Sequence, residues 1–499
     1  MVRPLTSLML LAALSAASTD AAHVHPRVHR ALQEQGTVNL MVTLSESPER
    51  VLQELEARDA AERRLATGNS TTSKWDIVRR GIRIKSLMDA LKKHHNETAK
   101  PVEAVIQEHT ASTPLFNTTR RFWMTNQLFF RNATGEFVEK LVNTPGIKDL
   151  REEVRFKLPH VLTVDALVDG GLAVNVSVDA SLAQWGVKKI GATTAWDNGT
   201  TGQGVVMGFI DTGVLATHET LHANFRGAAN YGWFDPEKKA ATPYDPQGHG
   251  TAVTSLAVGA KGYGVAPGAT WMACKACRDD DCPEADILSC LQWMLCPTDV
   301  NGENPDCSKA PHIINNSWGA DEVDWSYQPA IRSWVTAGII PVFANGNSGP
   351  ACGTVNYPAA YPEVISVGAS RSDDAVAPVS SKGPSADGTI KPDIIAPGYS
   401  VQSAWGDADD SYATNQGTSL SAPYTSGSIA LMFSATNRTL TLKQVRDALI
   451  GTTVKKIGPT LRTCGGTSDK VIPNNQFGYG RLDTAAAIAV VKIAVAAEV

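Results

Sequence analysis

The stretch Val205-Val206-Met207-Gly208-Phe209-Ile210 decides the fold class, because it is a continuous apolar run that ends directly at Asp211. Residues 339–343 and 364–367 form two further runs of the same kind, and helical patterns follow such runs. Apolar strands that alternate with helices are typical of a parallel sheet covered on both faces. From about residue 180 the sequence therefore predicts an α/β domain, with its functional residues at the carboxyl ends of the strands.

The composition is that of a globular protein large enough for two folded units. The chain has 499 residues, of which 43% are hydrophobic and 19% charged, with a formal net charge of -5. One hydrophobic core rarely serves more than about 250–300 residues. No basic surplus favours nucleic acid, and no apolar run after the N-terminus is long enough to cross a bilayer. The apolar stretch 484–499 contains Lys492 and Glu498, which favours a packed amphipathic helix over a lipid-anchor tail.

Residues 1–21 are typical of a secretory signal peptide, so we expect a secreted, extracellular protein. Arg3 precedes the apolar stretch 5–17, and small residues follow as far as Ala22. The alternative is an apolar N-terminal helix, but the run ends in small residues before a polar, histidine-rich stretch. Seven Asn-x-Ser/Thr triplets predict a glycoprotein: Asn69, Asn96, Asn117, Asn132, Asn175, Asn198 and Asn437. An eighth triplet, at Asn315, is expected to be buried and unmodified.

All eight cysteines lie at or after residue 274. An even number of cysteines behind a signal peptide predicts disulfide bonds, but the sequence does not choose among the possible pairings. Cys274 and Cys277 also have the spacing of zinc ligands, which leaves a zinc site as the alternative. An oxidising compartment favours the disulfides.

Residues 22–165 predict a small α+β (ferredoxin-like) unit. Alternating apolar residues at 38–44 indicate a strand, and Ser47-Pro48-Glu49 indicates a helix start. Polar sequence fills residues 66–119, and a second strand is expected at 122–130. Thr134 is expected to cap a helix that ends before Pro145-Gly146, and a last strand lies within 147–162. Residues 166–179 are interpreted as a linker with the maturation site, before a domain at 180–499.

Three residues could act together in catalysis. Asp211 ends a buried strand, where a carboxylate needs a partner. His249 lies between two glycines near a helix start, and glycine lets other groups approach the ring closely. Ser419 lies at or just before a helix N-terminus that favours negative charge, because Pro423 is tolerated only in a first turn. Taken singly, each has a plainer interpretation, as a turn aspartate, a loop histidine and a capping serine.

Taken together, the three residues supply the parts of an activated serine. Serine is a weak nucleophile at neutral pH and needs a general base. A neutral histidine can accept its proton, and a buried carboxylate fixes the tautomer and stabilises the imidazolium. Asp211, His249 and Ser419 therefore form a candidate triad in the chain order Asp, His, Ser.

This order and the local motifs resemble those of the subtilisin-like serine proteases, the subtilase family. The resemblance covers roughly residues 180–487 and implies a parallel-sheet subtilisin-like peptidase domain. It also implies a serine endopeptidase, a hydrolase that cleaves peptide bonds through an acyl-enzyme. The matching segments are Ile210-Asp211-Thr212-Gly213-Val214, His249-Gly250-Thr251, Gly264-Val265-Ala266-Pro267-Gly268, Lys391-Pro392-Asp393-Ile394-Ile395-Ala396-Pro397-Gly398 and Gly417-Thr418-Ser419-Leu420-Ser421-Ala422-Pro423.

The same resemblance implies further site residues. Asn347 would donate its side-chain amide to the oxyanion, with Asn345 as a less suitable candidate two residues away. Ser317, Trp318 and Gly319 would belong to an extended segment that pairs with the substrate backbone as an added strand. Asn356 would stand at the base of the first specificity pocket, where a polar residue disfavours bulky aromatic side chains.

The family pattern also bears on cofactors, partners and processing. No cofactor is required for the chemistry. Thr220 stands where calcium-binding relatives carry Asp, which weakens that site and leaves a structural calcium ion open. Leu420 replaces a methionine that is prone to oxidation in many relatives, so we expect an oxidation-tolerant enzyme. The expected partners are protein or peptide substrates and the chain's own propeptide, with no nucleic acid, no membrane anchor and a monomeric state.

Residues 22–165 resemble the family's inhibitory propeptide in pattern and position, which predicts a zymogen cut between about Leu162 and Ala183. The alternative for this unit is a permanent structural domain. The alternative for the whole chain is a catalytically inactive subtilisin-like binding protein. An exopeptidase with a blocked cleft is a second enzymatic alternative.

Overall fold

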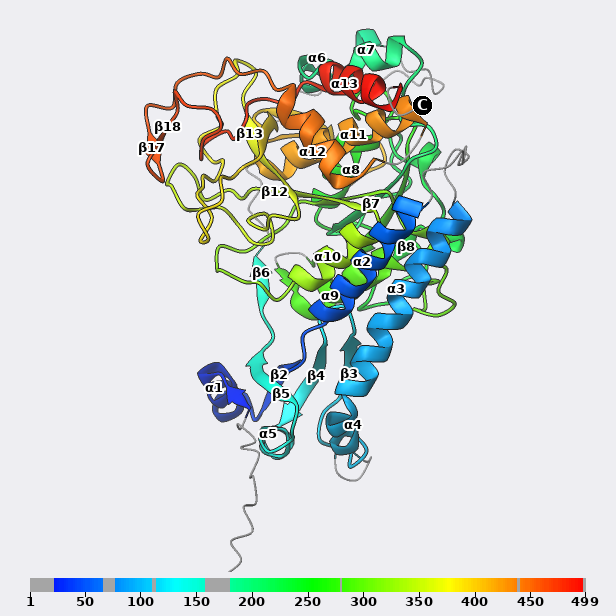
Figure 1. Ribbon diagram of the computed structural model, residues 1–499, viewed down its shortest axis with the longest axis vertical. Helices are drawn as coiled ribbons and strands as arrows, with labels where there is room; N and C mark the ends of the chain where they lie inside the picture. The colour runs from blue at the N-terminus through cyan, green and yellow to red at the C-terminus, as the bar shows by residue number, and fades with distance from the viewer. Residues whose placement is uncertain are drawn as a thin grey trace, which may run out of the picture. The chain divides into compact units, whose positions relative to one another are not determined.

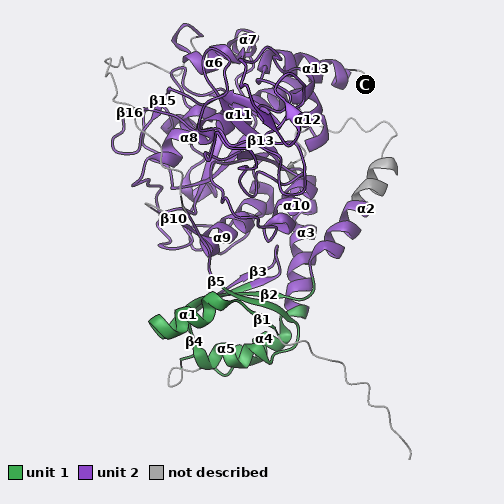
Figure 2. Cartoon of the chain, turned by 90° about the vertical axis from the view of Figure 1, so that its left-hand side faces the viewer, with its two compact units in different colours: residues 1–46, 98–119, 128–152 green, residues 47–97, 120–127, 153–499 purple. Residues whose placement is uncertain are grey.

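The computed structural model describes residues 22–65, 77–109, 114–157, 180–278, 281–437 and 440–496. The predicted signal peptide, the whole predicted linker and the sequons at Asn69 and Asn175 lie outside these residues. The chain divides into two compact units, shown in Figure 2. Unit 1 comprises Met1–Glu46, Thr98–Thr119 and Leu128–Glu152, and unit 2 comprises Ser47–Glu97, Arg120–Gln127 and Glu153–Val499.

Unit 1 contains most of a five-stranded sheet with the strand order β1-β5-β2-β4-β3. The core contains Val28, Leu40, Phe130, Phe137 and Leu150. The strands are β1 (His23–Val24), β2 (Thr37–Leu44), β3 (Thr118–Phe122), β4 (Gln127–Thr134) and β5 (Ile147–Glu152), and the helices are α1 (Pro26–Gln35), α4 (Lys100–Ile106) and α5 (Gly135–Val142).

Several predicted elements of residues 22–165 are confirmed. The strand at 38–44 is β2, and α2 (Glu49–Leu65) begins where the Ser47-Pro48-Glu49 motif indicated. The Thr134 side chain caps α5 by accepting a hydrogen bond from the Phe137 amide at 3.3 Å.

One prediction for this region was wrong, and the helices within the polar stretch were not predicted. Residues 122–130 do not form one strand, because β3 ends at Phe122 and β4 begins at Gln127 after a turn. The polar stretch 66–119 contains the 22-residue helix α3 (Ile77–Thr98) and the short helix α4. Four buried residues of α3, namely Ile84, Leu87, Met88 and Leu91, lie at helical spacing. That spacing was the signal for α3.

Unit 2 contains the predicted parallel sheet, with seven strands in the order β14-β13-β12-β11-β7-β9-β8. Each pair of neighbouring strands is parallel. The three apolar runs of the sequence form β7, β12 and β13, so the α/β fold is confirmed. The strands are β7 (Val206–Asp211), β8 (Trp233–Phe234), β9 (Thr270–Lys275), β11 (Ile313–Asn316), β12 (Ile340–Ala344), β13 (Ile365–Ser370) and β14 (Ile394–Pro397).

Helices cover both faces of this sheet, as Figure 1 shows for β7 and β12. Met207 and Phe209 of β7 share a core with residues of α8 (His249–Val258) and α11 (Thr418–Thr436). Gly208 faces the other way, since a Cβ atom there would lie 2.6 Å from Met294 Sδ of α9 (Glu284–Leu295). Successive strand residues point to opposite faces, so α9 covers the second face.

The remaining elements of unit 2 are short or peripheral. The predicted C-terminal helix is α13, and no helix among the described residues could cross a membrane. These elements are α3, α2, β6 (Arg155–Lys157), α6 (Trp185–Lys189), α7 (Ala192–Asp197), β10 (Asp281–Pro283), α10 (Gln328–Thr336), β15 (Val401–Ala404), β16 (Tyr412–Asn415), α12 (Leu442–Gly451), β17 (Thr463–Cys464), β18 (Thr467–Ser468) and α13 (Thr484–Ala496).

The eight cysteines form four disulfide bonds, which confirms the disulfide prediction. The alternative of a zinc site at Cys274 and Cys277 was wrong, because each of these sulfurs bonds to another cysteine. The pairs are Cys274–Cys290, Cys277–Cys282, Cys296–Cys307 and Cys352–Cys464.

Candidate active site

Asp211 and His249 form a buried pair at the carboxyl end of β7. Asp211 is the last residue of that strand, and His249 is the first residue of α8. His249 Nδ1 lies 2.7 Å from Asp211 Oδ1, and both residues are almost fully buried. His249 Nε2 has no hydrogen-bond partner among the described residues. The ring is therefore oriented by the carboxylate through one nitrogen, with its other nitrogen available.

Close backbone approaches explain the glycines around this pair. A Cβ atom on Gly250 would lie 2.0 Å from Gly213 O and 3.1 Å from Asp211 Cβ. A Cβ atom on Gly213, whose φ is +110°, would lie 2.0 Å from Tyr244 O. A side chain at position 250 would therefore push the start of α8 away from the end of β7, and one at position 213 would displace the main chain of residue 244.

Asp245 is a buried acidic residue near the pair that the sequence interpretation missed. Its carboxylate accepts hydrogen bonds from Thr212 Oγ1 at 2.8 Å, from the Gly248 amide at 2.9 Å and from Thr251 Oγ1 at 2.7 Å. These bonds link the segment after β7 to the first turn of α8. The signal in the sequence was an aspartate four residues before the histidine.

The electrostatic surroundings raise the pKa of His249 above its ordinary value of 6.5. Burial of the ring is the largest single effect and lowers the pKa. The charge and hydrogen bond of Asp211, together with the charge of Asp245, act in the opposite direction and outweigh it. The buried carboxylates therefore stabilise the imidazolium form of this ring.

Ser419 lies in the first turn of α11 and contacts the end of strand β11. Its hydroxyl donates a hydrogen bond to Ser317 O at 3.2 Å, and Ser317 Oγ donates to Ser419 O at 2.8 Å. Ser317 directly follows β11, whose last residue, Asn316, pairs with Ile210 of β7. Asp211 and Ser419 are thus brought to the carboxyl ends of two neighbouring strands.

The position of Pro423 differs from its prediction. We expected this proline in the first turn of the helix, but α11 begins at Thr418, so Pro423 is its sixth residue. A proline there cannot donate a hydrogen bond to the carbonyl four residues earlier, which belongs to Ser419. The hydroxyl of Ser317 satisfies that carbonyl instead. Ser317 therefore supports the helix turn that carries the candidate nucleophile.

The side chain of Asn347 contacts the start of α11, next to Ser419, whereas the side chain of Asn345 bonds elsewhere. The side-chain oxygen of Asn347 accepts hydrogen bonds from the Thr418 amide at 2.8 Å and from Thr418 Oγ1 at 3.0 Å. Asn347 Nδ2 would lie 3.0 Å from a Cβ atom on Gly417. Asn345 is buried and bonded through both side-chain atoms, to Ser381 O at 2.7 Å and Ser366 Oγ at 2.8 Å. Only Asn347 directs its amide toward residue 417.

The other predicted substrate-binding residues also meet on this side of the sheet. Trp318 is buried and packs edge-on against Phe343 of β12, with 5.5 Å between ring centroids. A Cβ atom on Gly319 would lie 3.1 Å from Asn356 Cβ, so the two predicted residues are in close contact. The Asn356 amide can donate to Asp321 Oδ1 at 3.0 Å. An acidic residue therefore accompanies the polar side chain at this position.

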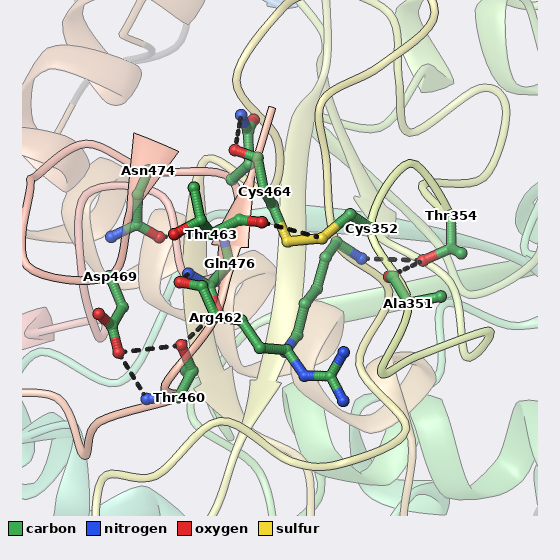
Figure 3. Close-up of a disulfide and its surroundings, with 12 residues drawn as sticks. Ala351, Cys352, Thr354, Thr460, Arg462, Thr463, Cys464, Asp469, Asn474 and Gln476 are labelled. Carbon is green, nitrogen blue, oxygen red and sulfur yellow. Dashed lines mark hydrogen bonds between the residues drawn. A yellow bond between two sulfur atoms is a disulfide. The ribbon is translucent and has the colours of Figure 1, made fainter. Parts of the chain in front are cut away.

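The Cys352–Cys464 disulfide fastens the loop between Asn347 and Asn356 to a distant part of the chain, as Figure 3 shows. The two cysteines are separated by 112 residues in the sequence. The Thr354 amide gives a further anchor by donating to Lys382 O at 2.8 Å. Asn347 and Asn356 are therefore each within five residues in the sequence of Cys352, which is crosslinked to Cys464.

Sequence reasoning missed a strand edge in the cysteine-rich stretch. β10 pairs antiparallel with β6, with Cys282 opposite Phe156. The ring of Phe156 is buried beside Tyr327 and Trp318, with centroid distances of 5.7 Å and 6.4 Å. An extended segment of this chain is thus bound at an edge next to the predicted substrate-binding residues. The pairing depends on the folded chain, which explains why the sequence interpretation left residues 274–307 unassigned.

The remaining predicted positions are placed as follows. Thr220 is buried and its hydroxyl lies 3.0 Å from His218 Nδ1, so an imidazole, rather than a carboxylate, is its nearest polar partner. Leu420 is buried next to the candidate nucleophile. The triplet at Asn315 is buried, as predicted. The sequon asparagines within the described residues are exposed, namely Asn96, Asn117, Asn132, Asn198 and Asn437.

Parallel strands covered by helices, with an Asp–His pair and a helix-borne serine at their carboxyl ends, define a subtilisin-like α/β fold. Residues 202–480 match the subtilase family, which is more than half of the chain and includes the predicted triad and Asn347. The chain therefore belongs to the subtilase family, the subtilisin-like serine proteases.

Curated relatives agree with this assignment. Bacillopeptidase F of Bacillus subtilis (strain 168) is 32% identical over 382 residues, which is 72% of this chain but only 26% of that protein. An alkaline protease of Alkalihalobacillus alcalophilus is 30% identical over 328 residues, 60% of this chain and 78% of that protein. Subtilisin Savinase of Lederbergia lenta is 31% identical over 258 residues, 51% of this chain and 85% of that protein.

Proposed function

We propose that this protein is a secreted serine endopeptidase that is made as an inhibited precursor. The buried Asp211–His249 hydrogen bond of 2.7 Å, together with a serine in the first turn of α11 that contacts the end of the neighbouring strand β11, carries the proposal. The chain has Asp, His and Ser at all three positions of the proposed triad, which argues against a catalytically inactive binding protein.

The proposed chemistry follows from the roles of these groups. Ser419 Oγ attacks the carbonyl carbon of the scissile peptide bond, and His249 Nε2 accepts the hydroxyl proton of Ser419 at the same time. Asp211 holds the ring through Nδ1 and stabilises the imidazolium. The Ser419 amide and Asn347 Nδ2 donate hydrogen bonds to the developing oxyanion. His249 then protonates the leaving amine, and water releases the acyl group in a second round of the same proton transfers.

Contacts within unit 2 support inhibition by residues 22–165. β6 occupies the β10 edge as an added strand, which is how an extended peptide substrate would pair. Just before β6, the Glu153 carboxylate accepts a hydrogen bond from the Ala285 amide in the first turn of α9 at 3.2 Å. Burial raises the pKa of Glu153. The chain just ahead of the proposed maturation site is thus bound through main chain and side chain.

A helical arm formed by α2 and α3 adds a second set of contacts within unit 2. Arg332 of α10 forms ion pairs with Glu49 and Glu56 of the arm. Arg80 of α3 donates a hydrogen bond to Ala310 O at 2.8 Å. Burial, followed by the charge of nearby arginines, lowers the pKa of Arg80 to about 9. We propose that this arm keeps the propeptide bound after cleavage.

An activity-based probe tests the catalytic assignment. The processed protein should react with a fluorophosphonate at Ser419, and His249→Ala should abolish the labelling while the protein stays folded. Cleavage of a long peptide at internal bonds would distinguish an endopeptidase from an exopeptidase. Failure of the folded, processed protein to react would exclude the proposed nucleophile.

A catalytically inactive variant tests processing. Ser419→Ala should accumulate as an uncut precursor, because the proposed maturation within about residues 162–183 is autocatalytic. A normally matured Ser419→Ala protein would show that another protease makes the cut. Mass spectrometry of the secreted protein would give the new N-terminus and the occupancy of the exposed sequons.

The remaining parts of the proposal concern the environment of the enzyme. We propose a monomer that acts on protein or peptide substrates outside the cell and needs no cofactor for its chemistry. A structural calcium ion would have to bind away from Thr220, whose hydroxyl is engaged with His218. Leu420 should make the enzyme tolerant to peroxide, because the residue that follows the nucleophile carries no thioether.

A further inference from the structure

Two histidines and an aspartate meet at the start of unit 1, outside the candidate active site. His23 lies on β1, His25 directly precedes α1, and Asp149 lies on β5. Among the described residues, these three are the group of His, Cys, Asp or Glu side chains whose ligand atoms are close enough to share one ion. Neither the proposed chemistry nor the proposed inhibition uses them.

Main-chain pairing holds the three residues in place. β1 and β5 are parallel, and His23 lies opposite Asp149. The His25 amide donates a hydrogen bond to Leu150 O at 2.9 Å. Asp149 also pairs with Thr43 of β2, so its backbone is fixed from both sides. The positions of the ligands therefore follow from the sheet itself.

The side chains converge on one oxygen. His23 Nδ1 and His25 Nε2 each lie 3.0 Å from Asp149 Oδ1. The two rings are 4.8 Å apart between centroids and nearly perpendicular, at 77°. All the ligand atoms lie within 4.8 Å of one another. Ligand atoms bound to zinc at about 2.0–2.2 Å lie roughly 3.3–3.5 Å apart, so small side-chain rotations would suffice.

The surroundings suit a metal ion that enters from solvent. The side chain of His23 is 67% exposed and that of His25 is 45% exposed, whereas that of Asp149 is 18% exposed. Two imidazole nitrogens and a carboxylate are ligands preferred by zinc, while calcium prefers an all-oxygen set. Three protein ligands leave the fourth tetrahedral position to water.

We propose that His23, His25 and Asp149 form a binding site for a divalent transition-metal ion, with Zn²⁺ as the expected occupant. The ion would crosslink β1 and the start of α1 to β5. Val28 of α1 and Leu150 of β5 belong to the core of unit 1. Metal binding would therefore stabilise the N-terminal edge of that unit in the precursor.

Zinc titration of the full-length chain tests the site, with Ser419→Ala present in every sample to keep the precursor intact. Isothermal titration calorimetry should show saturable binding of one Zn²⁺ per chain. His23→Ala, His25→Ala and Asp149→Asn should each weaken binding at least about 10-fold. His29→Ala is the matched control, because His29 is an exposed histidine of α1 outside the cluster, and it should bind zinc like the parent.

Structural readouts separate a built site from surface binding. X-ray absorption of the zinc-loaded precursor should show two imidazole ligands, and zinc should protect residues 22–35 from added protease. Circular dichroism should show that the variants remain folded, since the two histidines are exposed. Absence of saturable binding, or equal affinity in the His23→Ala and His25→Ala variants and the parent, would overturn the proposal.

Discussion

At the scale of single residues, His249 is governed by the carboxylates around it. Because their effect raises the pKa of this ring above 6.5, the ring stays protonated to a higher pH than an ordinary histidine. A protonated ring cannot act as a general base, so activity is lost as the pH falls through the raised pKa. The acid limb of kcat/KM should therefore lie above pH 6.5 in a pH–rate profile.

Asp245→Asn tests the cause of that shift. Its charge raises the pKa of His249 without a hydrogen bond to the ring. The variant should move the acid limb to lower pH, because one of the charges that raise the pKa of His249 is lost. An unchanged limb, or a shift to higher pH, would contradict this explanation. A purely structural loss would lower kcat/KM at every pH without moving the limb.

Asn347→Ala should slow the chemical step. Removal of one oxyanion donor costs on the order of 2.7–4 kcal/mol, which lowers kcat about 100- to 1000-fold. KM should change little, because the interaction forms in the transition state. Steady-state kinetics of the processed enzyme measure both constants.

Asn345→Ala is the matched control for Asn347→Ala. Both side-chain hydrogen bonds of Asn345 are internal, to Ser381 and Ser366. Its loss should lower the free energy of unfolding by about 1–3 kcal/mol, since buried partners are left unsatisfied. If Asn345→Ala lowered kcat as much as Asn347→Ala in folded protein, the assignment of the oxyanion donor would be wrong.

At the scale of elements, sequence reasoning succeeded where local chemistry decides structure. The apolar runs of β7, β12 and β13 and the Thr134 cap of α5 have short-range causes, and each was predicted. The β3–β4 turn was missed because the apolar residues on both sides of Thr125-Asn126-Gln127 were interpreted as one strand. The Cys352–Cys464 pairing, the Ser317–Ser419 bonds and the β6–β10 pairing depend on residues far apart in the sequence, so no local pattern reports them.

Cys352 and Cys464 allow a test of how the site loop is held. The Cys352→Ser/Cys464→Ser variant frees the loop between Asn347 and Asn356, so KM for peptide substrates should rise several-fold. The free energy of unfolding should fall by about 2–5 kcal/mol, because a long crosslink is lost. Peptide kinetics and urea unfolding measure the two effects.

The Cys296→Ser/Cys307→Ser variant is the control, since that crosslink closes a separation of only 11 residues. It should reduce stability without changing KM. Equal changes of KM in the two double variants would show that the effect is general loosening of the fold.

At the scale of the whole molecule, the same chain supplies a peptidase domain and the proposed inhibitor of that domain. Unit 2 already includes residues 47–97, which the sequence interpretation assigned to the propeptide. Phe156 and the α2–α3 arm contact different residues of unit 2, so the contribution of each to inhibition can be tested by its own substitution.

Phe156→Ala should weaken inhibition most strongly. Its ring is buried beside Tyr327 and Trp318, and truncation of a buried phenylalanine costs about 3–5 kcal/mol. Peptidase activity should therefore appear earlier after the maturation cut. Arg155→Ala is the matched control, because Arg155 lies on the same strand as Phe156 and its partly exposed ion pair with Asp281 of β10 contributes at most about 1 kcal/mol. Activity time courses of the two purified precursors give the comparison, and equal lag times would show that β6 does not hold the enzyme inactive.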